Sequence, residues 1–88
     1  MARVIVYYTP SCPYCMRARQ LFDAKGVNYE GIRVDTDPAL RREMQQKSGR
    51  YTVPQIFINQ QAIGGCDELY DLEAQGELDN MLAANTPN

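Results

Sequence analysis

The sequence predicts an α/β domain, in which a four-stranded mixed sheet carries helices on both of its faces. Three observations predict it: an apolar run at Val4 to Tyr8, a helical stretch that begins at Pro13, and strand-like and helix-like segments in the order βαβ, α, ββ, α. Alternation of this kind is typical of a layered α/β fold. Because 88 residues suffice for one modest core and not for two, we expect residues 1–88 to form a single domain.

The first third of the chain predicts a strand, a helix and a second strand. Val4 to Tyr8 is almost continuously apolar and rich in β-branched and aromatic residues, which is typical of a central strand covered on both faces. Pro13 begins a helix with apolar residues at helical spacing, and Lys25-Gly26 ends it. Val27 to Val34 predicts the second strand, in which Gly31 indicates a bulge or a switch of face.

The middle of the chain predicts a second helix and a hairpin. Asp37-Pro38 is a strong helix start, a cap followed by a proline at the first helical position, and we expect this helix to end at Ser48-Gly49. Gln55 to Ile58 predicts the third strand, and residues 59–61 form a turn short enough to lead directly into a fourth strand at Ala62-Ile63.

The last part of the chain predicts a broken helix. Gly64-Gly65 interrupts the pattern, and a helical segment follows that pauses at Gln75-Gly76 and then resumes. We expect the tail from Ala83 to Asn88 to fray, as chain ends do unless they are tied down.

Two cysteines three residues apart, Cys12 and Cys15, lie at the predicted strand-to-helix junction. Because Pro13 favours the first position inside a helix, Cys12 falls at the N-cap, where it faces unpaired backbone N–H groups and the positive end of the helix dipole. Both favour the thiolate, and Arg17 and Arg19 add positive charge nearby. The i, i+3 spacing brings the two Cβ atoms to roughly 5–6 Å, close to disulfide geometry. We therefore expect a redox centre in which Cys12 attacks and Cys15 resolves.

Two other interpretations of this cysteine pair are a zinc site and a structural disulfide. The chain has three cysteines and no histidine, so Cys12, Cys15 and Cys66 would need a carboxylate or a second chain to complete a zinc site, and we expect no metal. A disulfide that closes so short a loop removes little entropy from the unfolded chain, so it would stabilise the fold poorly.

Composition and charge argue against several classes of partner. The net charge is −2, with acidic and basic residues interspersed, so we expect neither a nucleic-acid partner nor a membrane partner. The first residues have too short an apolar run for a signal peptide or a membrane span, and we expect a cytoplasmic protein. In the cytosol, a pair of cysteines at this spacing is more often catalytic than structural.

The order of the elements, with two cysteines after the first strand, is that of a thioredoxin-like fold. Three segments in this order and spacing, Cys12-Pro13-Tyr14-Cys15, Thr52 to Ile58 and Gly64 to Leu69, resemble the glutaredoxin family, and in particular its small bacterial dithiol type. The likeness covers nearly the whole chain. It implies a glutathione-dependent thiol–disulfide oxidoreductase that reduces protein disulfides and glutathione–protein mixed disulfides, with glutathione as co-substrate.

The resemblance also implies a glutathione site, which it assigns to Tyr14, Arg41, Thr52, Val53, Pro54, Cys66 and Asp67. In glutaredoxins the proline that matches Pro54 is cis, which turns the backbone of the residue matching Val53 toward the cysteinyl group of the substrate. The N–H groups that match those of Cys66 and Asp67 receive the γ-glutamyl carboxylate, as a helix N-terminus can. The position of Arg41 is that of a residue that pairs with the glycyl carboxylate.

Each of these residues also has a simpler interpretation. Asp67 can be a helix cap, Arg41 one member of a solvated basic face, Cys66 a small buried hydrophobic residue and Tyr14 a surface aromatic residue. The chain also departs from the family at Thr9, where many glutaredoxins have a lysine three residues before the first cysteine.

Two rival functions stay open beside the glutathione-dependent enzyme. One is a redoxin that a flavoprotein reductase reduces. The other is a carrier in which two chains and two glutathiones ligate one [2Fe–2S] cluster through Cys12, although family members of that kind usually lack the equivalents of Pro13 and Cys15. We expect a monomer.

Overall fold

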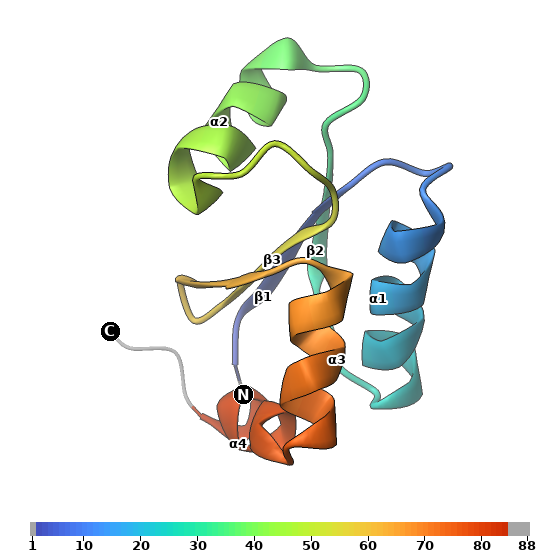
Figure 1. The fold of residues 1–88 in the computed structure, drawn as a ribbon, viewed down its shortest axis with the longest axis vertical. Coiled ribbons are helices and arrows are strands. Elements are labelled where there is room, and N and C mark those ends of the chain that lie inside the picture. The colour runs from blue at the N-terminus through green and yellow to red at the C-terminus, as the bar shows by residue number, and fades with distance from the viewer. Residues whose placement is uncertain (1, 85–88) are drawn as a thin grey trace.

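The fold is a four-stranded mixed sheet with helices on both faces, as predicted (Figure 1). The computed structural model describes residues 2–84, so most of the tail expected to fray lies outside the described residues. In chain order the elements are β1 (Val4–Tyr8), α1 (Pro13–Ala24), β2 (Glu30–Arg33), α2 (Pro38–Ser48), β3 (Gln55–Ile58), β4 (Gln61–Gly64), α3 (Cys66–Ala74) and α4 (Glu77–Ala83). Within residues 2–84, no helix is long and apolar enough to cross a membrane.

The sheet has the strand order β2-β1-β3-β4, which makes β1 a central strand as expected. β1 runs parallel to β2 and antiparallel to β3, and β3 runs antiparallel to β4. The parallel pair is joined by the crossover helix α1, because parallel neighbours cannot be connected by a tight turn.

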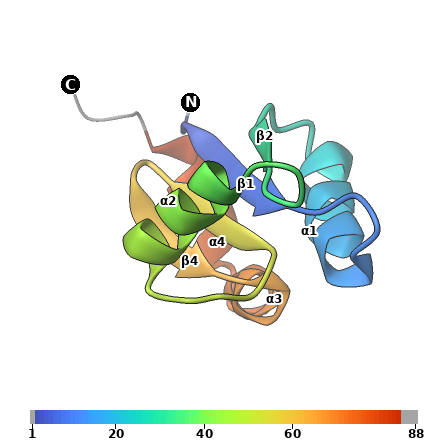
Figure 2. The same cartoon turned by 90° about the horizontal axis from the view of Figure 1, so that it is seen from above.

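Side chains that alternate along β1 and β3 divide the core between the two faces of the sheet. Val4, Val6, Ile56 and Ile58 point toward the face covered by α1, α3 and α4, whose buried residues include Phe22, Leu69 and Leu78. Tyr7 and Phe57 point to the opposite face, where they pack with Met44 of α2. Figures 1 and 2 accordingly show α2 apart from α1 and α3.

The second helix begins and ends where the sequence predicts, and local interactions explain both ends. The carboxylate of Asp37 accepts the backbone N–H groups of Ala39 and Leu40, with 3.0 and 3.4 Å between nitrogen and oxygen. At the other end, Gly49 adopts a left-handed conformation with φ of 73°, which ends the helix.

Of the two alternatives expected at Gly31, the structure has the switch of face and no bulge: Val27 and Tyr29 pack with one half of the core, and Ile32 and Val34 with the other. The second strand is shorter than predicted. The register between β1 and β2 is unbroken, with Val6 opposite Gly31. The glycine also leaves room for a neighbouring ring, because a Cβ atom on Gly31 would lie 3.0 Å from the ring of Tyr8. The irregularity in the sheet lies instead in the β3–β4 hairpin, between Ile56 and Phe57.

Three segments that are distant in the sequence meet at one end of the sheet. They are the start of α1, the loop of residues 49–54 before β3, and the start of α3 (Figure 1). Both cysteines of the predicted redox pair and most of the predicted binding residues belong to these segments.

Candidate active site

Cys12 is the N-cap of α1, as the proline after it predicts. Its sulfur accepts the backbone N–H of Cys15, with 3.4 Å between Sγ and N. The thiol in turn donates to the carbonyl oxygen of Val53, 3.8 Å from Sγ. Because Cys12 is half-buried, its sulfur can meet a substrate from the solvent side while backbone groups hold it in place.

Cys15 lies one helical turn further along α1 and is fully buried. Burial, with a smaller contribution from the neighbouring Cys12, raises the pKa of the Cys15 thiol to about 11, and hydrogen bonds with Thr9 oppose the shift. All three cysteines, Cys66 included, are free thiols. The two members of the pair therefore differ in exposure: Cys12 is half-buried and Cys15 is fully buried.

A groove with a volume of about 230 Å³ lies beside the cysteine pair. Its lining residues are Tyr14, Arg50, Thr52, Val53, Pro54, Gly65, Cys66, Asp67 and Glu68. Cys12 is not one of them, but the carbonyl of Val53 that contacts its sulfur is at the edge of the groove. The peptide bond between Val53 and Pro54 is cis, as the resemblance implies.

Six of the seven predicted binding residues line this groove, and Arg41 is the exception. Arg41 is half-buried on α2, and its charge helps Arg33 to hold the pKa of Asp35 below its usual range. The pairing of Arg41 with the glycyl carboxylate of glutathione stays a prediction. Asp67 is exposed and is not the cap of α3, because the N-cap position belongs to Gly65.

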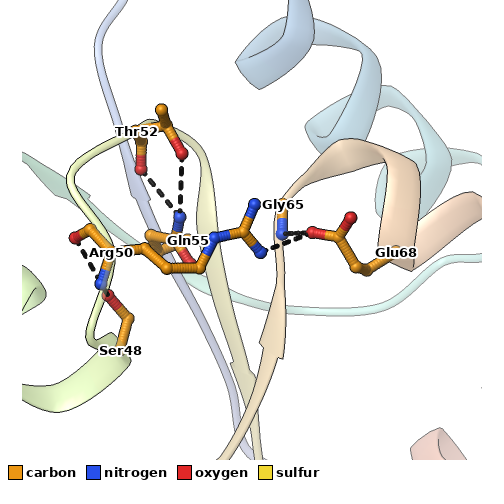
Figure 3. A network of polar contacts seen from close by, with 6 residues as sticks. All are labelled: Ser48, Arg50, Thr52, Gln55, Gly65 and Glu68. Atoms are coloured by element: carbon orange, nitrogen blue, oxygen red, sulfur yellow. Dashed lines mark hydrogen bonds and ion pairs between the residues drawn. The ribbon is translucent and has the colours of Figure 1, made fainter.

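Arg50 and Glu68 also line the groove, although no sequence motif marks them. Glu68 Oε1 accepts from Arg50 Nη1 at 2.6 Å and from the backbone N–H of Gly65 at 2.7 Å (Figure 3). These two donors hold the pKa of Glu68 below its usual range. The three-residue spacing from Gly65 to Glu68 is that of a capping box, but a glycine at the N-cap removes the Ser or Thr that makes this motif visible in a sequence.

The two arginines of α1 lie against aromatic rings. The guanidinium carbon of Arg17 is 5.1 Å from the centre of the Tyr70 ring, and that of Arg19 is 4.4 Å from the centre of the Tyr8 ring. Burial raises the pKa of the Cys66 thiol, and the charge of Arg17 opposes that shift. Cys66 is thus a buried thiol in the groove wall, which agrees with its interpretation as a small buried residue.

The groove is not the largest cavity of the protein. A cavity of about 420 Å³ is lined by Arg3, Ile5, Tyr7, Lys47, Phe57 and Gln60, and it contains none of the predicted site residues. Across residues 2–84, no group of three or more His, Cys, Asp or Glu side chains is arranged to hold a metal ion.

The sequence model of the glutaredoxin family matches residues 4–63. Glutaredoxin 3 of Escherichia coli K12 is 52% identical over 82 residues, which cover 93% of this chain and 99% of that protein. The solution structure of a Brucella melitensis glutaredoxin has a TM-score of 0.82 at 51% identity and covers 93% of this chain and 89% of its own. The buckwheat glutaredoxin–glutathione complex has a TM-score of 0.85 at 34% identity, over 92% of this chain and 76% of its own. The chain therefore belongs to the glutaredoxin family, and it is a thiol–disulfide oxidoreductase with a thioredoxin-like fold.

Proposed function

We propose that the protein uses glutathione to reduce protein disulfides and glutathione–protein mixed disulfides, with Cys12 as the nucleophile and Cys15 as the resolving thiol. One observation carries the proposal: the Cys12 sulfur lies 3.8 Å from the carbonyl oxygen of Val53, at the edge of a groove that ends at the start of α3. A neighbour of similar structure is a complex with glutathione, which supports the same substrate for this chain.

The groove is suited to an extended tripeptide with a carboxylate at each end. The backbone of Val53 can pair with the cysteinyl residue, which brings the substrate sulfur to Cys12. The N–H groups of Cys66 and Asp67, at the first positions of α3, can receive the γ-glutamyl carboxylate. Tyr14, which is 56% exposed, and Thr52 border the groove, and we keep Arg41 as the partner of the glycyl carboxylate.

The reduction of a mixed disulfide requires only Cys12. Its thiolate attacks the glutathione sulfur, and the disulfide bond breaks with its electron pair leaving on the protein sulfur, which takes up a proton. The glutathionyl group now forms a disulfide with Cys12. A second glutathione thiolate attacks that group, releases the Cys12 thiolate and leaves as glutathione disulfide. The net reaction converts the mixed disulfide and one free glutathione into the protein thiol and glutathione disulfide.

The reduction of a protein disulfide also requires Cys15. Cys12 attacks one sulfur of the disulfide, and Cys15 then attacks the Cys12 sulfur, which releases the substrate as a dithiol and leaves a Cys12–Cys15 disulfide. Two glutathiones reduce that disulfide. Burial keeps Cys15 protonated beforehand, and the formation of the mixed disulfide removes the Cys12 thiolate, whose charge raises the pKa of Cys15. We propose that a monomer performs these reactions in the cytoplasm, where family potentials of roughly −200 to −230 mV suit reduction by glutathione.

The test is the reduction of a glutathione mixed disulfide, coupled through glutathione reductase to the oxidation of NADPH. We expect rapid turnover by wild type, loss of turnover in Cys12→Ser, and turnover that persists in Cys15→Ser. With a protein disulfide as substrate, we expect both variants to be inactive.

Two results would contradict the proposal in different ways. If Cys15→Ser lost both activities, the division of roles between the two thiols would be wrong. If wild type did not turn over with glutathione but did so with NADPH and a flavoprotein reductase, the protein would be a redoxin of another kind.

A further inference from the structure

The Arg50–Glu68 ion pair lies at the end of the groove where α3 begins (Figure 3). We propose that Arg50 is a positioning residue, which neutralises Glu68 and so keeps the start of α3 able to bind the carboxylate of an anionic peptide substrate. The inference rests on the proposed function, because it takes the γ-glutamyl carboxylate as the group bound by the N–H groups of Cys66 and Asp67.

Glu68 places a fixed negative charge at the site proposed for that carboxylate. Its Oε1 atom accepts the N–H of Gly65, the N-cap of α3, at 2.7 Å. The N–H groups of Cys66 and Asp67 follow directly, so an incoming carboxylate would lie next to that of Glu68. Two like charges at close range repel each other, and this repulsion opposes the attraction of the helix end.

Arg50 supplies the charge that balances Glu68. Its Nη1 atom lies 2.6 Å from the same Oε1 atom. Glu68 is ionised at neutral pH, since the Gly65 N–H and Arg50 hold its pKa below the usual value of 4.5. The Arg50 and Glu68 side chains are 47% and 41% exposed, so both border the solvent from which the substrate arrives.

Gly64 leaves the space that this ion pair occupies. A Cβ atom on Gly64 would lie 2.6 Å from Glu68 Oε1 and 2.9 Å from Arg50 Nη1. Its φ of 112° is also a value that residues with side chains rarely adopt. The chain thus has a residue without a side chain at a position next to both charged groups.

Other contacts hold the loop that carries Arg50, so its guanidinium is not needed to fix Val53. The Arg50 backbone N–H donates to Ser48 Oγ at 3.1 Å. The buried amide of Gln55 donates to the carbonyl oxygen of Thr52 at 2.8 Å (Figure 3). Removing the Arg50 side chain should therefore change the charge of the groove and leave its shape in place.

The test is a double-mutant cycle on kcat/KM for a glutathione mixed disulfide of a short peptide. We expect Arg50→Gln to lower kcat/KM about five- to tenfold through KM, with kcat changed less than about twofold. We expect Glu68→Gln to raise kcat/KM, because it removes the repelling charge and leaves that of Arg50. We expect the double variant to return to within about twofold of wild type, because it lacks both charges. Arg50→Lys keeps the charge and should behave as wild type.

The same cycle separates this role from two others, and either of them would overturn the inference. If Arg50 only braced the loop, both single variants and the double variant would lose activity alike. If Arg50 bound the substrate directly, the double variant would stay as weak as Arg50→Gln. A substrate whose γ-glutamyl carboxylate is an amide adds a second readout: Arg50→Gln should leave its kcat/KM unchanged.

Lys25→Gln is the control, because it breaks ion pairs with Glu73 and Asp79 at the C-terminal end of α1, and none of these residues lines the groove. Thermal unfolding of every variant identifies any that fail to fold. A wild type without turnover on either substrate would contradict the proposed function itself. Normal turnover in both wild type and Arg50→Gln would contradict this inference alone.

Discussion

The difference between the two thiols can be measured directly by alkylation. We predict that iodoacetamide at pH 7 modifies Cys12 in the folded protein and leaves Cys15 unmodified. Three proteins are compared: wild type, Cys15→Ser, and Cys12→Ser, in which Cys15 is the remaining thiol of the pair. Desolvation, the largest cause of the raised pKa of Cys15, persists in that variant.

In Cys12→Ser, burial still raises the pKa of Cys15, but the part of the shift caused by Cys12 is lost. In wild type, where Cys12 contributes to the shift, the expected rate follows from the Cys15 pKa of about 11. At pH 7 about 1 in 10,000 Cys15 side chains is a thiolate, against about 1 in 30 for an ordinary cysteine with a pKa near 8.5. A thiolate of higher pKa is more nucleophilic, and this recovers about tenfold of the difference. Ionisation alone therefore slows Cys15 about 30-fold, and complete burial of the side chain slows it further.

Mass spectrometry of peptides from timed samples gives the rate for each cysteine. For Cys15 we expect the rate to rise about tenfold per pH unit from pH 7 to pH 10, because the thiolate fraction rises in that proportion below the pKa. Protein unfolded in urea is the control, in which all thiols should react alike. A Cys15 rate equal to that of an exposed cysteine, or one that levels off below pH 9, would refute the argument.

Two further predictions concern stability, measured by urea unfolding. Tyr7→Phe removes the hydroxyl that donates to Glu43 Oε2 at 2.6 Å, and should lower the free energy of unfolding by about 1–2 kcal/mol, since Glu43 keeps some access to water. Burial raises the pKa of Tyr7 above its usual value of 10, so wild type should lose stability as the pH rises past about 10. The difference in unfolding free energy between wild type and Tyr7→Phe should therefore shrink above that pH. A difference that stays constant with pH would contradict this prediction. Gly64→Ala should cost about 1–3 kcal/mol from its backbone conformation, and more from contact with Glu68. Gly76→Ala, with a positive φ and open space around it, is the control, and equal costs would show that the contact contributes nothing.

Most of the fold could be predicted because its signals are local. Asp37, Pro38 and Gly49 mark the two ends of α2 through short-range hydrogen bonds and a backbone conformation, and neither depends on the rest of the fold. The apolar run of β1 likewise indicates a central strand from its own residues. The hairpin turn was harder to place, because Asn59 and Gln60 both take positive φ and Gln61 therefore already belongs to β4.

Those residues of the candidate site could be predicted that belong to a recognisable sequence motif. The N-cap position of Cys12 followed from Pro13 alone. The cis bond before Pro54 and the groove position of Asp67 came from the family resemblance, since neither has a local signal. Arg41 shows the limit of this transfer: it matches the family in sequence position, but the groove is lined without it.

Arg50 and Glu68 were missed for a physical reason that bears on how the groove works. Each has an ordinary local explanation, a basic residue after a helix end and an acidic residue in the first turn of a helix. Their meeting depends on the loop and α3 coming together at one end of the sheet, and on Gly64 leaving room between them. An acidic side chain at a helix N-terminus repels an anionic ligand that binds there, unless a nearby cation neutralises its charge. Arg50, which pairs with Glu68, comes from the loop before β3 and not from α3. The charge at the proposed binding site is therefore set by tertiary structure, and no motif within α3 could have revealed it.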